Sequence, residues 1–183
     1  MVLSSAWLPA IWRYLAIIAA ATLGWETAQM PLYTLWRTGT TAAIAFAVLH
    51  CTGGDALIAG ASLLGSLLLF GAADWPHARF RSVAVATIIL GTAYTIYSEH
   101  LNTARNAWTY SDRMPVLPGL GTGLAPLAQW VVVPVLAFCA MRSAARREFR
   151  APMANKGLDL PIIGSPTSGS GSGNSSRSSR RVP

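Results

Sequence analysis

Charged residues are scarce in this sequence. Asp, Glu, Lys and Arg together make up 11% of the 183 residues, whereas a typical soluble domain is about one quarter charged. Apolar residues account for 52% of the chain. This scarcity of charge excludes a disordered protein, whose composition would be polar and charged, and it argues against a water-soluble enzyme. The composition indicates an integral membrane protein.

Cysteine is scarce as well, and common catalytic motifs are missing. Cys51 and Cys139 lie in separate apolar stretches and form no CxxC pair, which excludes a disulfide framework and a zinc knuckle. The glycine-rich segment 119–123 has no Lys-Ser or Lys-Thr ending, so it predicts a tight turn rather than a phosphate-binding loop. The chain contains no GxSxG nucleophile elbow.

The positive charge is concentrated at the C-terminal end. The whole chain has a net charge of +7, yet the segment from Arg142 onward carries +6 of it. A uniformly basic domain would suggest a nucleic-acid partner, and we expect none here. A nearly neutral apolar body with a basic end is typical of a membrane protein whose C-terminus stays in the cytoplasm.

Four segments come close to the roughly 20 apolar residues that a membrane-spanning helix needs. A fifth apolar piece, 40–50, is too short to cross, and joined to the next segment it would be too long. Because glycine weakens a helix interior, Gly53-Gly54 predicts a break after this piece. The fold class is therefore all-α: a polytopic membrane bundle of four transmembrane helices plus one short re-entrant or interfacial helix at 40–50. The four spans are expected at about 5–25, 55–73, 82–100 and 124–142.

The loop charges predict the orientation. With four spans and a cytoplasmic C-terminus, the N-terminus and the loop 74–81, which contains Arg79 and Arg81, also lie inside, as the positive-inside rule requires. We expect a multi-pass membrane protein, with a membrane domain at 1–150 and a disordered Gly/Ser/Arg-rich cytoplasmic tail at 151–183. The alternative for the N-terminus is a signal peptide cleaved near residues 19–21.

This orientation brings most of the remaining polar residues to the outer side. Ionisable groups at the edge of membrane spans are costly and usually face the bundle interior or a cavity, so we expect an outward-facing polar pocket there. On the third span, Thr92, Thr95 and Glu99 are spaced to share one helix face with Asn102 and Asn106. Most of the tryptophans are expected to form an interfacial belt. The candidate pocket residues are Glu26, His50, Cys51, Asp55, Glu99, His100, Asn102, Arg105 and Tyr110.

A binding or accessory role is the function that we favour for such a cluster, and the sequence leaves two other functions open. Asp55 and Glu99 are candidate catalytic acids or bases on a lipid-soluble substrate; Asp55 is alternatively a first-turn acid that caps the second span. His50 and His100, with the nearby carboxylates, are candidate ligands of a divalent metal or a haem. A binding or accessory role would use the pocket for an ion, a lipid or a partner helix. The expected partners are the lipid bilayer and either another membrane protein or a second copy of the chain.

Three stretches carry a family resemblance. PLYTLW (31–36), LHCTGGDALIA (49–59) and YSEHLNTARNAWTYSDRMPVLPGLGTGLAPLAQW (97–130) resemble a family of small bacterial inner-membrane proteins of unassigned function, over most of residues 10–141. In addition, the order of Glu99, Trp108-Thr109-Tyr110, the following prolines and Trp130 is similar to that in membrane-bound carotenoid hydratases and cyclases. This second likeness implies acid/base chemistry on an isoprenoid substrate.

Overall fold

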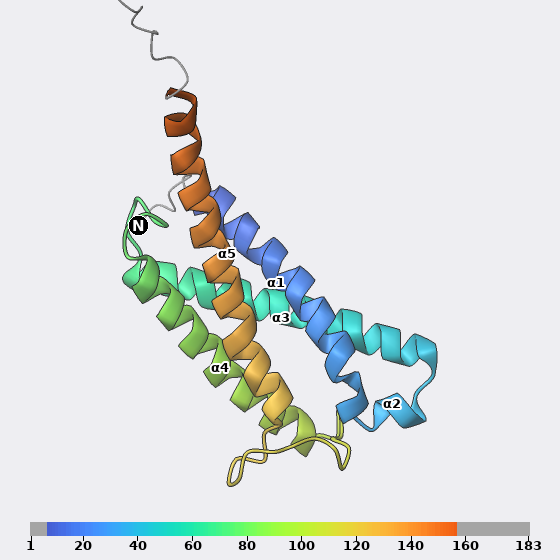
Figure 1. Cartoon of the computed structure of the whole chain (residues 1–183). Coiled ribbons are helices and arrows are strands. Elements are labelled where there is room, and N and C mark those ends of the chain that lie inside the picture. The colour runs from blue at the N-terminus through green and yellow to red at the C-terminus, as the bar shows by residue number, and fades with distance from the viewer. Residues whose placement is uncertain (1–6, 157–183) are drawn as a thin grey trace, which may run out of the picture. The chain divides into compact units, whose positions relative to one another are not determined.

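The computed structural model describes residues 7–156, and the side chains of residues 7–143. It contains four long helices, a four-residue helix and one 3-10 turn, η2 (Met30–Leu32). Within the described residues, the connections between the helices contain isolated β-bridges and no strands. The expectation of an all-α fold is confirmed. In chain order the α-helices are α1 (Leu8–Gln29), α2 (Leu35–Thr38), α3 (Thr41–Phe70), α4 (Phe80–Ala104) and α5 (Leu124–Lys156) (Figure 1).

Four of the helices are long and apolar enough to cross a membrane, which confirms the expected number of spans. The membrane-crossing segments are Leu8–Leu32, Thr41–Phe70, Phe80–Ala104 and Leu124–Ser143. Their outward faces are apolar: Leu57, Ile89 and Leu136 are each more than half exposed. In water such a surface would cause aggregation, but it matches the hydrocarbon interior of a bilayer.

The expected break at Gly53-Gly54 is wrong. Helix α3 runs without interruption from Thr41 to Phe70, so residues 41–50 form its first third rather than a separate short helix. A break inside the hydrocarbon layer would leave backbone groups unpaired, which costs more there than the low helix propensity of two glycines. The helix is roughly 45 Å long at about 1.5 Å of rise per residue, so it must tilt in a core of about 30 Å. Figure 1 shows α3 crossing obliquely to the direction of α1, α4 and α5.

The short helix of the fold is α2, which lies in the connection between α1 and α3. Its C-terminal end is closed by the backbone N–H of Gly39, which donates to the carbonyl of Leu35 at 2.8 Å. This connection packs through Leu32 and Leu35 into a small apolar cluster built around Met30, Tyr33, Val48 and Met114. The cluster joins the first third of α3 to the loop before α5.

Hydrogen bonds pair the connections at each end of the bundle. At one end, the indole N–H of Trp7 donates to the carbonyl of Ala72, in the α3–α4 connection, at 3.0 Å. At the opposite end, the α1–α3 connection pairs with the α4–α5 connection: Thr34 N–H donates to Thr109 at 3.0 Å and Ser111 N–H to Leu32 at 2.9 Å. The helices therefore alternate in direction along the chain, as four spans require.

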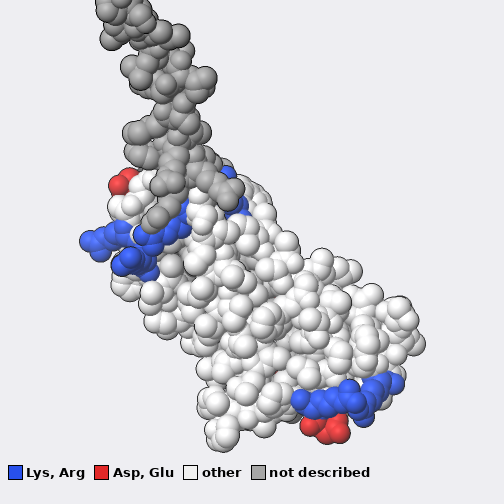
Figure 2. Space-filling view, viewed as in Figure 1, with Lys and Arg blue, Asp and Glu red and all other residues white. Residues whose placement is uncertain are grey.

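Most of the exposed charged side chains that the structure describes gather at these two ends. The α3–α4 connection and the start of α4 carry Asp74, Arg79 and Arg81, while α2 and the α4–α5 connection carry Arg37 and Asp112, which form an exposed ion pair at 3.9 Å. Figure 2 shows a wide uncharged band between two charged ends on the face in view. This distribution is what a bilayer imposes, because charged groups avoid the hydrocarbon layer.

The predicted glycine turn is also present. Gly119 and Gly121 have φ angles of +84° and +66°, in the left-handed region that residues with a Cβ adopt only at a cost. The N–H of Gly121 donates to the carbonyl of Leu117 at 3.0 Å, which closes the turn ahead of α5.

The C-terminal boundary differs from the expected one. The chain divides into two units, residues 1–147 and 148–183, and α5 continues to Lys156. Residues 151–156, which we expected in the tail, are therefore helical. The remainder of the expected tail, residues 157–183, lies outside the described residues.

Replacing Trp7 by alanine tests the connection between α1 and the α3–α4 loop. Trp7 is 3% exposed and belongs to the main apolar core, so we expect Trp7→Ala to lower the free energy of unfolding in detergent by about 3–5 kcal/mol. The matched control is Trp12→Ala in α1, the helix that begins directly after Trp7, because Trp12 is 66% exposed and its replacement should cost far less. Equal losses for the two variants would contradict the packing described.

Candidate functional site

Three carboxyl groups from three helices lie close to one another at the α2 end of the bundle. Glu26 of α1 is 6% exposed, Glu99 of α4 is 7% exposed, and Asp55 of α3 is half-buried. All three lie within membrane-spanning segments. Because ionisable groups in such segments are costly, they indicate a function unless a structural role explains them.

Glu26 and Asp55 form a carboxyl pair. Their side chains lie within hydrogen-bonding reach of each other across the contact between α1 and α3. An ionised carboxylate can only accept hydrogen bonds, so a bond between two carboxyl groups requires that one of them holds a proton. The arrangement is therefore suited to the sharing of one proton.

Two buried amides surround this pair. Gln29 Nε2 donates to Glu26 Oε1 at 2.8 Å, and Gln129 Nε2 donates to Asp55 Oδ2 at 2.6 Å. The two amides are joined to each other, since Gln29 Nε2 also lies 3.3 Å from Gln129 Oε1. Gln129 lies on α5 and is 2% exposed. All four membrane-spanning helices therefore contribute side chains to the site.

Indole groups contribute further donors. Trp25 Nε1 donates to Gln29 Oε1 at 3.1 Å, and the Trp130 side chain lies within hydrogen-bonding reach of the Asp55 carboxyl. The expected tryptophan belt is therefore only partly right. Trp12 and Trp36 are exposed as a belt residue should be, whereas Trp75 and Trp130 are buried. Buried indoles in hydrocarbon need an acceptor, and the carboxyl network supplies one for Trp130.

Side chains of the α4–α5 connection donate hydrogen bonds to Glu99. Its Oε2 accepts a hydrogen bond from the Tyr110 hydroxyl and a longer one, 3.4 Å, from Trp108 Nε1. The Tyr110 oxygen in turn accepts from the N–H of Gly123 at 3.1 Å. The Tyr33 ring packs against that of Tyr110, with centroids 5.7 Å apart. Glu99 is thus connected through one phenol to the start of α5.

The groups around the three carboxyls are uncharged. Amides, phenols, indoles and the Cys51 thiol lie near them, and within the described residues no Lys or Arg side chain contacts them. Glu26 lies near enough to both Asp55 and Glu99 to interact with each electrostatically. The donors and acceptors present therefore suit proton transfer rather than ion pairing.

The two histidines that were candidate metal ligands lie outside this network. His50 and His100 are exposed, and the His50 ring stacks on Phe46 with centroids 5.5 Å apart. Within residues 7–143 no group of three His, Cys, Asp or Glu side chains is placed to hold a metal ion. The expected ligand set of His50, His100 and carboxylates is therefore not assembled in this arrangement.

The other expected pocket residues divide between the network and its surroundings. Cys51 is half-buried near the carboxyls, whereas Arg105 is exposed. Asn102 bonds locally, donating to the carbonyl of Ser98 at 2.8 Å. Helix α4 ends at Ala104, so Asn106 leaves the polar stripe. The interpretation of Asp55 as a capping residue is wrong, because it lies in the middle of the continuous α3.

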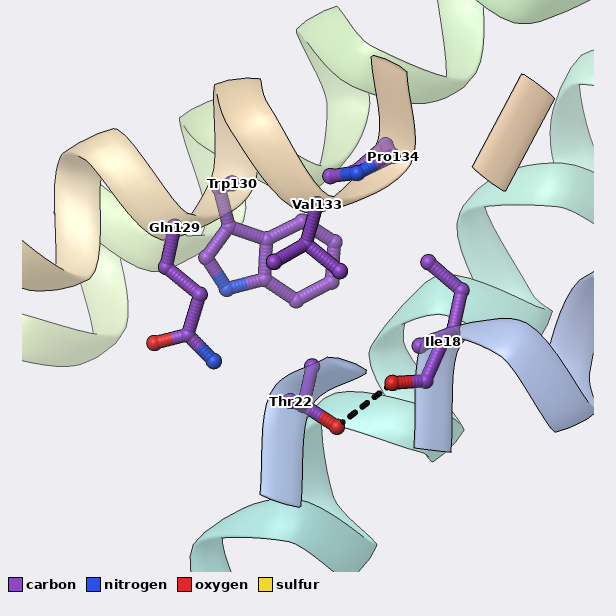
Figure 3. Close-up of a pocket in the computed structure, with 6 residues that line it drawn as sticks. All are labelled: Ile18, Thr22, Gln129, Trp130, Val133 and Pro134. Atoms are coloured by element: carbon purple, nitrogen blue, oxygen red, sulfur yellow. Dashed lines mark hydrogen bonds between the residues drawn. The ribbon is translucent and has the colours of Figure 1, made fainter. Parts of the chain in front are cut away.

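A small hollow adjoins the network between α1 and α5. Figure 3 shows Trp130 and Val133 facing Ile18 and Thr22 across it, with Gln129 and Pro134 completing the wall. The Thr22 hydroxyl is occupied, because it donates to the carbonyl of Ile18 at 2.8 Å. The hollow is therefore mainly apolar, and its space suits about one water molecule.

Besides the indole donors Trp25 and Trp108, four residues of the network were not among the sequence candidates. They share no common motif, but two had a signal. Gln129 is a lone amide in an otherwise uncharged apolar span, and Gln29 follows Glu26 by three positions, which places both on one helix face. The packing of Tyr33 and Trp130 against distant helices has no counterpart in local sequence. The four are Gln29, Tyr33, Gln129 and Trp130.

Comparison of the chain with protein-family models, curated proteins and solved structures finds no match. The geometry of the carboxyl network is therefore the basis for the functional conclusion.

The two tyrosines of the site predict alkaline destabilisation. Burial raises the pKa of Tyr33, helped by the charges of Glu99 and Glu26, and it raises the pKa of Tyr110, helped by the hydrogen bond to Glu99. A folded-state pKa above the unfolded value of about 10 gives stability that is complete below that pH. This stability is lost as the pH rises above it toward the folded-state pKa.

We therefore expect the free energy of unfolding to fall above about pH 10, and to fall less steeply in Tyr33→Phe and Tyr110→Phe. Unfolding in detergent across this pH range measures it, with Tyr97→Phe as the control because Tyr97 is 62% exposed. An unchanged pH slope in both site variants would contradict the burial of these phenols.

Proposed function

We propose that the protein is a membrane-embedded acid/base enzyme that acts on an isoprenoid-like lipid. In this proposal the Glu26–Asp55 pair donates a proton to a carbon–carbon double bond of the substrate. Glu99, which accepts hydrogen bonds from Tyr110 and Trp108, takes up a proton later in the reaction. Return of a proton to the pair through Glu26, which interacts with both Asp55 and Glu99, would restore the starting state.

The observation that carries this proposal is the close approach of the Glu26 and Asp55 carboxyls inside the membrane-spanning part of the bundle. A structural ion pair would place a cation beside a carboxylate, and none is found there within the described residues. A pair of carboxyls that shares a proton is instead suited to general acid catalysis. Water is scarce at such a site, which strengthens its electrostatic interactions.

The substrate class follows from the surroundings. A substrate that approaches from the bilayer must be apolar, and the hollow beside Gln129 and Trp130 is lined mainly by apolar groups. Protonation of an alkene produces a carbocation, and aromatic faces attract cations. Trp25, Trp108 and Trp130 lie around the carboxyls and would serve this purpose.

The resemblance to membrane-bound carotenoid hydratases and cyclases adds support. The residues that carry it, Glu99, Trp108, Tyr110 and Trp130, are spread over 32 positions of sequence. Here Trp108 and Tyr110 both bond to Glu99, and Trp130 lies within hydrogen-bonding reach of Asp55. All four therefore belong to the same carboxyl network.

Amide replacements test the proposed catalysis. Purified protein in liposomes is incubated with squalene or lycopene in D₂O, and deuterium in the recovered lipid is measured by mass spectrometry. We expect wild-type protein to introduce solvent deuterium, and Asp55→Asn and Glu99→Gln to lower the rate about 100-fold or more. Asp112→Asn is the control, because Asp112 is exposed and pairs only with Arg37 among the described residues. Rates in Asp55→Asn and Glu99→Gln equal to wild type would refute the assignment.

A binding or accessory role is the second candidate, and one observation favours it. The network satisfies much of its hydrogen-bonding capacity with its own side chains, and the adjoining hollow suits only about one water molecule. In that case the carboxyls hold the four helices together for contact with a partner. The same amide variants would then lower the amount of folded protein in the membrane while no lipid acquires deuterium.

We further propose that the protein lies in the bacterial inner membrane with both termini in the cytoplasm. The support is the charge pattern, because Arg79 and Arg81 lie at the end opposite to the carboxyl network. Cysteine labelling tests it in a chain that lacks Cys51 and Cys139. We expect a membrane-impermeant maleimide to label Leu120→Cys, at an exposed loop position, in cells whose outer membrane is permeabilised. His77→Cys should react only after lysis; the reverse pattern would overturn the orientation.

A further inference from the structure

Trp130 has contacts on three sides. Its side chain lies within hydrogen-bonding reach of the Asp55 carboxyl of α3, and its ring forms part of the wall of the hollow that faces α1 (Figure 3). On the α4 side it lies against Gly91: a Cβ at that position would collide with the six-membered part of the ring, at Cζ3 and Cε3. Trp130 is 4% exposed and belongs to the main apolar core.

Gly91 stands out among the glycines of the membrane-spanning helices. At Gly24, Gly53 and Gly54 a Cβ would meet nothing within 4 Å, and at Gly60 and Gly65 it would make ordinary contacts of 3.5 and 3.8 Å. Among these six glycines, Gly91 is the one whose position for a Cβ is filled by a neighbouring side chain. Gly91 also lies on the buried stripe of α4, two turns before Glu99.

We propose that Gly91 is a positioning residue for the carboxyl site, and that it acts through Trp130 on Asp55. The absence of a Cβ lets the indole ring lie directly on α4, and this position brings the indole N–H to the Asp55 carboxyl. A side chain at residue 91 pushes the ring away from α4 and breaks that contact. The inference goes beyond the proposed function, because the contact exists without a substrate and holds whether the site catalyses or binds.

The geometry explains why a glycine is needed at this place. Helix α4 and helix α5 could pack with an alanine at the contact if the residue opposite were small. Tryptophan is the largest side chain, and interiors are packed too closely to absorb an added methyl group without displacement. Since the ring also contacts the hollow on its other side, the displaced indole moves toward α1 and away from its position at Asp55.

Infrared spectroscopy of the full-length protein in bilayers tests the inference. The C=O stretching band of the protonated carboxyl pair is identified by its loss in Asp55→Asn. We expect Trp130→Phe, which removes the indole donor, to shift this band, and Gly91→Ala to shift it in the same direction. The matched control is Gly53→Ala, which lies two positions from Asp55 on α3 and has open space for a Cβ; its band should stay where it is in the wild type.

The double variant separates positioning from a general loss of packing. If Gly91 acts through Trp130, adding Gly91→Ala to Trp130→Phe produces no further shift, because the donor is already gone. The smaller phenyl ring also leaves room for the alanine, so the double variant remains folded even where Gly91→Ala alone does not. A further shift in the double variant, or an unshifted band in a folded Gly91→Ala protein, would overturn the proposal. Neither result depends on lipid turnover, so it leaves the proposed catalysis to its own test.

Discussion

The close approach of the Glu26 and Asp55 carboxyls is the constraint on which the site depends. Two acidic groups are brought together where water is scarce, and every polar atom nearby must find a partner in the protein. Gln29 and Gln129 meet this demand from α1 and α5, and Trp130 adds a donor. The need to satisfy one carboxyl pair thus ties α1, α3 and α5 together at one level of the bundle.

The connections at the same end complete this arrangement. The phenol of Tyr110 bonds to Glu99 on one side and accepts from Gly123 on the other, so the loop before α5 takes part in the site as well as covering it. The backbone pairing of Thr34 with Thr109 fixes the two connections to each other. A few hydrogen bonds therefore connect the carboxyl groups of the membrane-spanning helices to the loops at this end of the bundle.

The four spans and their alternating directions were predictable, because hydropathy and the bilayer thickness determine them almost alone. Glu26, Asp55 and Glu99 were also found, since charge in an apolar segment is conspicuous. The continuity of α3 through Gly53-Gly54 was not, because helix propensities measured in water understate the cost of a broken backbone in lipid. His50 and His100 were misjudged for a different reason: sequence places them at the right depth, but only packing decides which side of a helix faces inward. Trp130 likewise gains its role from Gly91, 39 positions away.

The oblique course of α3 has a consequence for how the protein responds to the lipid around it. Asp55 lies at the midpoint of a helix that is longer than the hydrocarbon core is thick. When the bilayer thins or thickens, such a helix adjusts its inclination. Asp55 is tied to α1 through Glu26 and to α5 through Gln129, so these contacts resist that adjustment.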